Sequence, residues 1–461
     1  MQANGSVSTY IDANRDRFRE ELFEFLRIPS VSARSEHRGD TRRAAEWLMA
    51  KMKEAGLETV LHETAGHPIL VGEWRGAGSD APTVLIYGHY DVQPAEPLDL
   101  WTSTAFEPEI RDGRIYARGS VDDKGQLYVH VKAIEAHLRG NGRLPVNVIV
   151  LAEGEEEVGS ENLMPFVEQH ADMLRPDAVV ISDTTMFAPG MPTIGASLRG
   201  LAYFEIRVHG AKSDLHSGSY GGAVANPAAA LARIIATFHD DDGRILIDGF
   251  HDDVRASPEF VEQIRTLPFD EAAYLEETGV PELAGEKGYT TYERLWIRPT
   301  CEVNGLLSGY TGEGSKTVLP SYAMAKVSCR LVPDQDPKKI ETLFRKHVKK
   351  VAPQGVTVEV LVLHGGKPWR ARLEGRLYEA GARALRDAFG RDVIYAGEGG
   401  SIPIVPEFER VLGAPALLMG FGLPGENAHA PDEWMSVENF EKGTHAAAAL
   451  LTELAGMKRG R

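Results

Sequence analysis

The sequence predicts an α/β fold in which a discontinuous domain, with a mostly parallel sheet between helices, is interrupted by an inserted α+β domain. Three observations support this prediction. Short apolar runs alternate with helical patterns before residue 194, half-exposed strand patterns replace them in the middle of the chain, and the first kind of pattern returns near the end. The length of 461 residues also exceeds what one hydrophobic core usually serves.

Two helices are predicted at the start of the chain. Apolar residues recur at helical spacing over residues 11–26, and the pattern stops before Pro29 because proline disfavours helix in the residue that precedes it. A second helix is predicted over residues 41–55, with Asp40 as its N-cap and Gly56 as its C-terminal stop.

Strand patterns then alternate with helical ones. Apolar and β-branched runs predict strands at residues 84–87, 146–152 and 178–182. Helical patterns separate them, at residues 127–138 and 163–169. This alternation is typical of a largely parallel sheet that is covered by helices.

The middle of the chain has a different pattern. Residues 201–209 and 324–331 alternate like half-exposed antiparallel strands, and helical stretches follow Pro227 and Pro337. Helix, strand, strand and helix patterns similar to those of the first part return at residues 377–389, 393–395, 416–419 and 437–454.

These patterns divide the chain into three parts. Residues 1–197 and 369–461 are expected to form the discontinuous α/β domain, and residues 198–368 the inserted α+β domain. No internal repeat or low-complexity segment indicates another arrangement.

The composition excludes several classes of partner. There are 50 lysines and arginines against 67 acidic residues, which gives a formal net charge of −17. The basic surface that nucleic acid or an anionic membrane requires is therefore not expected. No apolar stretch approaches the roughly 18–20 residues of a membrane span, and the opening MQANGSVSTY lacks the regions of a signal peptide, so we expect a cytoplasmic protein.

The only two cysteines, Cys301 and Cys329, form no CxxC pair. Neither a disulfide framework nor a thiolate zinc site is indicated. A metal ion in this protein must therefore use nitrogen and oxygen ligands.

The first candidate site is the sequence GHYDVQP, directly after the predicted strand at residues 84–87. On an extended backbone His89 and Asp91 point to the same side, so Asp91 can accept from one imidazole nitrogen while the other binds a metal. The alternative is a turn histidine that binds nothing.

The second candidate is RGSVDDKG, where Asp122 and Asp123 stand in a glycine-flanked loop before a predicted helix. An N-cap for that helix would need only one acid, and it remains the alternative. The third is the acidic run GEEEVGS, which contains Glu156 and Glu157. Most acidic runs are solvated, but this one follows a strand, where clustered negative charge is unfavourable without a cation.

Asp183 follows another predicted strand, and His429 lies in the stretch GLPGENAHAPDEW; each alone is weak evidence. Together, these histidines and carboxylates suit a pair of Zn²⁺ or Mn²⁺ ions. Two such ions ~3.5–4 Å apart can share a hydroxide and stabilise a tetrahedral intermediate. A nearby carboxylate that is not a ligand must then move the proton, and either Glu156 or Glu157 suits that role.

GHYDVQP, RGSVDDKG and GEEEVGS, in that order, resemble the di-metal aminoacylase, desuccinylase and carnosinase-type family of metallopeptidases, over nearly the whole chain. The resemblance implies that Asp122 bridges two divalent ions, with zinc expected first and manganese or cobalt as alternatives. It also implies a cis peptide bond after Asp122. The remaining roles that it implies are His89 and Asp183 on one metal, Glu157 and His429 on the other, Glu156 as general base and acid, and Asp91 as the residue that orients His89.

Within the inserted domain, SDLHSG resembles the family's lid motif. The resemblance implies that His216 reaches the active site of the other subunit of a homodimer and stabilises the oxyanion there. The inserted part would then be a lid and dimerisation domain on a catalytic domain. Arg330 is implied to bind a substrate carboxylate, for which its planar fork is suited. Further substrate-contacting residues implied by the resemblance are Asn304, Thr317 and Ser401.

An extra acidic, helical-looking stretch at residues 240–298 favours the dipeptidase branch of this family. We therefore expect cleavage of dipeptides or similar small peptides by a metal-bridging hydroxide. The enzymatic alternative is an N-acyl amino acid deacylase of the acetylornithine or succinyl-diaminopimelate type. The alternative outside enzymes is an inactive homologue that binds metals or ligands.

Overall fold

The computed structural model describes residues 2–400 and 402–457. The chain forms two compact units. The first contains the described residues up to Ala196, Ala371–Ala396, and those from Glu407 onward; the second contains Ser197–Arg370 and the described part of residues 397–406. Among the described residues, no helix is both long and apolar enough to cross a membrane.

The first unit is built on a sheet whose strands follow the order β1-β2-β6-β3-β7-β17-β8. The four central strands, β6, β3, β7 and β17, are parallel, and β2 and β8 flank them in antiparallel pairing. In the same order the strands span Glu58–His62, Ile69–Trp74, Asn147–Glu153, Thr83–His89, Ala178–Ile181, Ala416–Leu418 and Thr193–Leu198.

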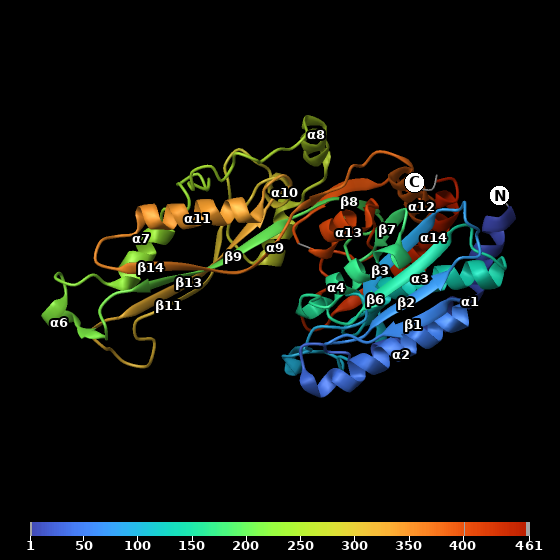
Figure 1. Ribbon diagram of the computed structural model, residues 1–461, viewed down its shortest axis with the longest axis horizontal. Helices are drawn as coiled ribbons and strands as arrows, with labels where there is room; N and C mark the ends of the chain where they lie inside the picture. Colours follow the sequence, from blue (N-terminus) through green and yellow to red (C-terminus); the bar gives the residue numbers. More distant parts are fainter. Residues whose placement is uncertain (1, 401, 458–461) are drawn as a thin grey trace. The chain divides into compact units, whose positions relative to one another are not determined.

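Helices cover both faces of this sheet (Figure 1). Tyr87 of β3 packs edge-on against Phe408 of α13, with 5.2 Å between ring centroids. The next residue, Gly88, faces Leu127 of α3, because successive side chains of a strand point to opposite faces. The helices of this unit are α1 (Gln2–Leu26), α2 (Arg38–Ala55), α3 (Lys124–Gly140), α4 (Leu163–Gln169), α5 (Ala171–Leu174), α12 (Arg376–Phe389) and α14 (Val437–Leu454), and α13 (Ile404–Leu412) begins in the second unit.

Short elements complete the first unit. A small sheet pairs β18 (Trp434–Ser436) with β5 (Arg114–Tyr116) and β5 with β4 (Glu109–Arg111). The 3-10 turns are η1 (Ser35–His37), η2 (Leu98–Leu100) and η3 (Glu156–Val158). Strand β16 (Ile394–Glu398) pairs with β8.

The prediction that Asp40 caps the second helix is wrong. Helix α2 begins at Arg38, and its N-cap is His37. Asp40 lies in the first turn, where its carboxylate is 2.7 Å from His37 Nδ1 and also pairs with Arg43, so it is not available to cap. Gly56 ends this helix in the left-handed conformation, as predicted.

The second unit has an antiparallel sheet in the order β11-β13-β9-β14. These strands span Glu302–Ser308, Tyr322–Leu331, Gly200–His209 and Thr357–Gly366. Helices α7 (Pro227–Ile235) and α11 (Pro337–Val351) cover one face of this sheet. In the core between the sheet and these helices, Phe204 of β9 stacks on Phe344 of α11. Both helices begin with proline, which suits the first turn of a helix.

The rest of this unit consists of short elements. Strand β10 (Leu215–His216) pairs with β12 (Val318–Leu319), and α6 (Ser217–Tyr220) follows β10. Residues 240–298 contain α8 (Pro258–Thr266), α9 (Glu271–Thr278) and α10 (Thr291–Trp296), and β15 (Trp369–Arg370) pairs with the end of β8. The predicted fold class, a mostly parallel α/β layer with a separate α+β part, is confirmed.

Candidate metal centre

Neighbouring parallel strands place several of the predicted site residues at one edge of the large sheet. His89 is the last residue of β3, Glu156 and Glu157 follow β6, and Asp183 follows β7. The carboxyl ends of parallel strands meet at the same edge, where open α/β sheets usually bind their ligands. Side chains far apart in the sequence are therefore brought together.

Asp122 occupies the centre of this cluster, in the loop before α3. Its Oδ1 lies 3.1 Å from His89 Nε2, and its Oδ2 lies 2.9 Å from His429 Nε2. Two groups of potential ligands share it: one contains His89 and Asp183, the other Glu157 and His429, and the ligand atoms of each group lie within 4.8 Å of one another. The same carboxylate thus belongs to both groups.

The orientation of the His89 ring is fixed by Asp91, two residues further along the chain. Its Nδ1 lies 3.1 Å from the backbone oxygen of Asp91 and 3.4 Å from Asp91 Oδ1, so Nδ1–H donates and Nε2 is left toward Asp122. Asp91 is fully buried, and its Oδ2 accepts the backbone N–H of Glu157 at 3.2 Å. Asp91 therefore orients residues of both ligand groups.

Gln93 is a site residue that the sequence analysis missed. Its Nε2 donates to Glu157 Oε2 at 2.7 Å, and this oxygen is also 3.3 Å from His429 Nε2. The alternation that places His89 and Asp91 on one side continues to Gln93, and this spacing could have identified it.

Asp123 does not act as the predicted alternative, a helix cap. It stands at the N-cap position of α3 but makes no capping bond with its side chain, and Oδ2 instead accepts the backbone N–H of His89 at 3.2 Å. A Cβ on Gly88 would lie 2.6 Å from this Oδ2, so the close approach requires glycine. The Asp122–Asp123 peptide bond is cis, as the resemblance implied.

Three carboxylates of the cluster, those of Asp122, Glu156 and Asp183, have strongly perturbed pKa values. Burial, reinforced by the charge of Asp122, raises the pKa of Asp183 to about 7. Burial also raises the pKa of Glu156 well above its ordinary value. Burial acts in the same direction on Asp122, but hydrogen bonds from His429 and His89 outweigh it and lower its pKa.

This donor set fits divalent cations. Hydrogen bonds to Asp122 and Glu157 raise the pKa of His429 to about 10, which reflects the excess of negative charge around its ring. Imidazole and carboxylate ligands suit zinc, manganese or cobalt, and two such cations would offset the buried carboxylates. Glu156 belongs to neither ligand group of the described chain.

His216 and Thr317 lie close together in the second unit. The backbone N–H of Ser217 donates to the Thr317 oxygen at 3.1 Å, beside the pairing of β10 with β12. The exposed His216 ring accepts the backbone N–H groups of Gly218 and Ser219 at Nδ1, at 3.1 and 3.2 Å. This ring therefore caps the short helix α6.

The other predicted substrate residues are also in the second unit. Arg330 is half-buried on β13, and burial lowers the pKa of its guanidinium. Asn304 is exposed on β11, where the register shifts between Val303 and Gly305. Ser401 lies outside the described residues.

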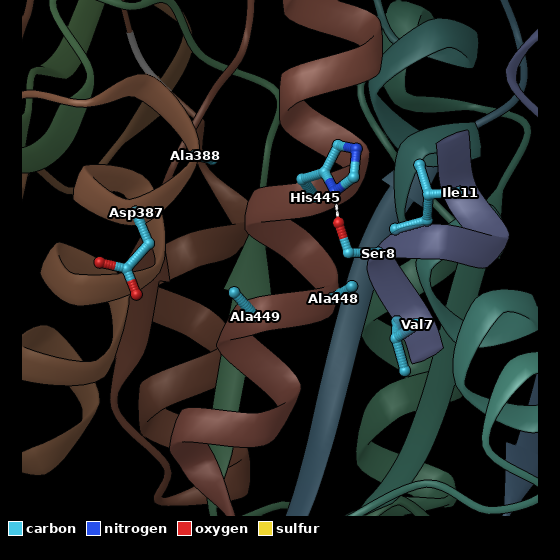
Figure 2. A pocket seen from close by; sticks show the side chains of 8 residues that line it. All are labelled: Val7, Ser8, Ile11, Asp387, Ala388, His445, Ala448 and Ala449. Carbon is cyan, nitrogen blue, oxygen red and sulfur yellow. Dashed lines mark hydrogen bonds between the residues drawn. The ribbon is translucent and has the colours of Figure 1, made fainter. Parts of the chain in front are cut away.

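A separate pocket of about 250 Å³ lies among α1, α12 and α14 (Figure 2). Ser8 and His445 line it, with 3.5 Å between the Ser8 hydroxyl and His445 Nδ1, and Asp387 projects from α12. None of its lining residues belongs to either ligand group.

Comparisons with known proteins support a relationship over nearly the whole chain. Residues 85–453 match the family model described as peptidase family M20/M25/M40. The chain is 32% identical to a Cys-Gly metallodipeptidase of Schizosaccharomyces pombe over 97% of each chain. It is 29% identical to the human Beta-Ala-His dipeptidase, over 95% of this chain and 86% of the relative.

Solved structures agree with this relationship. Human carnosine dipeptidase 1 superimposes with a TM-score of 0.84 at 28% identity, covering 98% of this chain and 99% of the other. An M20 family metallo-carboxypeptidase from Sulfolobus solfataricus gives a TM-score of 0.84 at 35% identity, covering 95% and 99%. The chain therefore belongs to peptidase family M20/M25/M40, and its relatives include named metallodipeptidases.

Proposed function

We propose that this protein hydrolyses the peptide bond of dipeptides and binds two divalent metal ions at the centre described above. The observation that carries this proposal is the position of Asp122, whose two oxygens face two imidazoles of different ligand groups. His89 and Asp183 would hold one ion, and Glu157 and His429 the other. Zinc is the ion we expect, with manganese or cobalt as alternatives.

When bound, two such ions polarise the scissile carbonyl and lower the pKa of water. The chain's own residues supply the proton transfer. We assign it to Glu156, which stands at the end of β6 beside the ligand Glu157 but belongs to neither ligand group. Its carboxylate takes a proton from the attacking water and returns it to the leaving amine.

We further propose that the second unit completes the site as a lid within a homodimer. Because His216 Nδ1 accepts two backbone N–H groups, the neutral ring carries its proton on Nε2, which can donate to an oxyanion of the partner chain's substrate. Arg330 would bind the C-terminal carboxylate of the substrate through its planar fork. We also propose that Asn304, Thr317 and Ser401 contact the substrate.

A cytoplasmic location is also part of the proposal. The two cysteines, Cys301 and Cys329, are buried and unbridged. Free thiols of this kind suit a reducing compartment.

The test combines metal analysis with a substrate panel. The purified protein is first assayed for bound metal. Hydrolysis of free dipeptides, N-blocked dipeptides and N-acetyl or N-succinyl amino acids is then measured. Each assay is repeated after chelation and after Zn²⁺ or Mn²⁺ has been restored. We expect close to two ions per chain and chelator-sensitive cleavage of free dipeptides. Turnover confined to N-acylated amino acids would show a deacylase instead, and efficient cleavage of N-blocked substrates would show a carboxypeptidase. Metal binding without any turnover would identify an inactive homologue.

A further inference from the structure

Glu433 lies in the same loop as His429, but its side chain turns inward and is fully buried. One oxygen, Oε2, accepts the backbone N–H of Gly119 at 3.0 Å, and the other, Oε1, accepts those of Val121 and Asp122 at 3.0 and 3.2 Å. The loop that leads into Asp122 is thus wrapped around a single carboxylate.

Arg118 neutralises this buried charge. Its Nη1 donates to Glu433 Oε2 at 2.7 Å, and its side chain is 1% exposed. Its Nη2 donates to the backbone oxygen of Pro94 at 3.2 Å, in the segment that continues from His89 and Asp91. A planar guanidinium can serve both acceptors at once, whereas an ammonium acts as a point charge.

The Arg118–Glu433 pair therefore connects three segments that carry predicted ligands. These are the segment after β3 with His89, the loop with Asp122, and the loop with His429. Buried polar groups of this kind fix the ligands that they contact, and losing one commonly lowers metal affinity without any change to the ligands themselves.

We propose that Glu433, held by Arg118, is a positioning residue of the metal centre: it fixes the backbone of Asp122 so that both carboxylate oxygens face their imidazoles. Glu433 acts through Asp122 and contacts neither substrate nor metal. The inference rests on the proposed function, because it supposes that Asp122 binds metal.

The test is the Zn²⁺ affinity of metal-free protein, measured by competition with a chelating dye, for the wild type and Glu433→Gln. The amide preserves the shape but presents N–H groups to N–H donors and removes the charge that Arg118 neutralises. We expect the Zn²⁺ affinity of at least one site to fall roughly 10- to 100-fold. With metal in excess, kcat on a dipeptide should fall while KM changes little, because no substrate contact is removed.

Glu426→Gln is the matched control. Glu426 is also a buried glutamate of this loop, 3% exposed, but its carboxylate accepts from the backbone of Leu423 and Ser436 and not from the Asp122 loop. The control should lower thermal stability and leave Zn²⁺ affinity close to that of the wild type. Equal losses of affinity in the two variants would show general damage to the loop and overturn the proposal.

Unchanged affinity in folded Glu433→Gln would also overturn it. If Glu433→Gln does not fold, Arg118→Lys tests the proposal instead. This substitution keeps the positive charge but loses the hydrogen bond to Pro94. We expect it to lower Zn²⁺ affinity, by less than is expected for Glu433→Gln. Wild-type affinity in Arg118→Lys would then refute the positioning role. A wild-type protein that binds no Zn²⁺ would overturn both this inference and the proposed function, whereas the variant outcomes bear on the inference alone.

Discussion

Asp122 is the residue on which both ligand groups depend. We expect Asp122→Asn to lower metal content well below two ions per chain, because an amide has one oxygen and no negative charge to offer two cations. Loss of several kcal/mol of charge stabilisation corresponds to a fall in kcat/KM on the order of 1000-fold. Metal analysis and steady-state kinetics measure both effects.

Asp177→Asn is a suitable control for that variant. The Asp177 carboxylate accepts the backbone N–H of Thr83 at 2.7 Å, at the opposite end of β3 from His89. Metal content should be retained in the control. Full metal content and activity in Asp122→Asn would contradict the bridging role.

Glu156 allows the proton-transfer role to be separated from metal binding. Glu156→Gln should keep its metal ions and lose about 10²- to 10⁴-fold in kcat, because the amide cannot accept a proton. The neighbouring Glu155→Gln is the control, since the Glu155 carboxylate accepts from His67 N and Asn162 Nδ2 and belongs to neither ligand group of the described chain. A Glu156→Gln enzyme with the wild-type rate would refute the assignment.

The sequence motifs predicted most of the residues that the structure gathers at the edge of the sheet, because GHYDVQP, GEEEVGS and Asp183 each follow an apolar strand and Asp122 stands just before a helix. Gln93 and Glu433 were not identified. Their partners are distant in the sequence: Glu433 and Gly119 are 314 residues apart. The contact of Glu433 is decided by the packing of the whole unit, and no local pattern encodes it, whereas the alternation that continues from His89 and Asp91 could have identified Gln93.

For single helices and strands, the predicted bounds agree with the observed ones where the local sequence pattern is strong. Helix α14 has the predicted bounds, Val437–Leu454, and α7 and α11 begin at the predicted prolines. Strand β1 was missed because it is an edge strand with polar ends and an exposed side, so it shows no apolar run. Helix α13 was missed because Pro406 reads as a helix stop in the sequence, although it lies in the first turn of this helix, where proline is tolerated.

Helices α1 and α3 are joined by a buried ionic cluster, which gives a prediction on stability. Lys132 Nζ lies 2.6 Å from both Glu21 and Glu135, and its side chain is 1% exposed. Lys132→Met should lower the free energy of unfolding by about 3–5 kcal/mol, because two carboxylates lose a buried partner. Lys51→Met, which removes a longer 3.7 Å pair with Glu21, should cost at most about 1 kcal/mol.

The same cluster gives a pH dependence. Burial raises the pKa of Glu21, but Lys132, Tyr128 and Arg17 outweigh it and lower the value to about 2, from an ordinary 4.5. The stabilisation is therefore complete above about pH 4.5 and lost as the pH falls toward 2. Denaturant unfolding of Lys132→Met should show a shallower loss of stability over this range than the wild type. Parallel curves would contradict this account.

For the whole molecule, the proposed homodimer can be tested by complementation. A dimer of one Glu156→Gln chain and one His216→Ala chain should contain one intact site, in which Glu156 and His216 come from different chains. Random mixing should then recover about a quarter of wild-type activity, given two-fold symmetry. Mixing His216→Ala with a chain that carries both substitutions should recover none. Absence of recovery in dimers shown to be mixed would contradict action across subunits.

Strand β17 lies between β7 and β8 in the large sheet, although it follows both of them by more than two hundred residues of chain. During synthesis on the ribosome, the strand between β7 and β8 is therefore missing from the sheet until nearly all of the protein has been made. The same late segment brings His429 and Glu433. A nascent or prematurely terminated chain consequently has neither a continuous sheet nor both of the proposed ion sites, and such fragments should be recognised by chaperones and proteases rather than act as weak hydrolases.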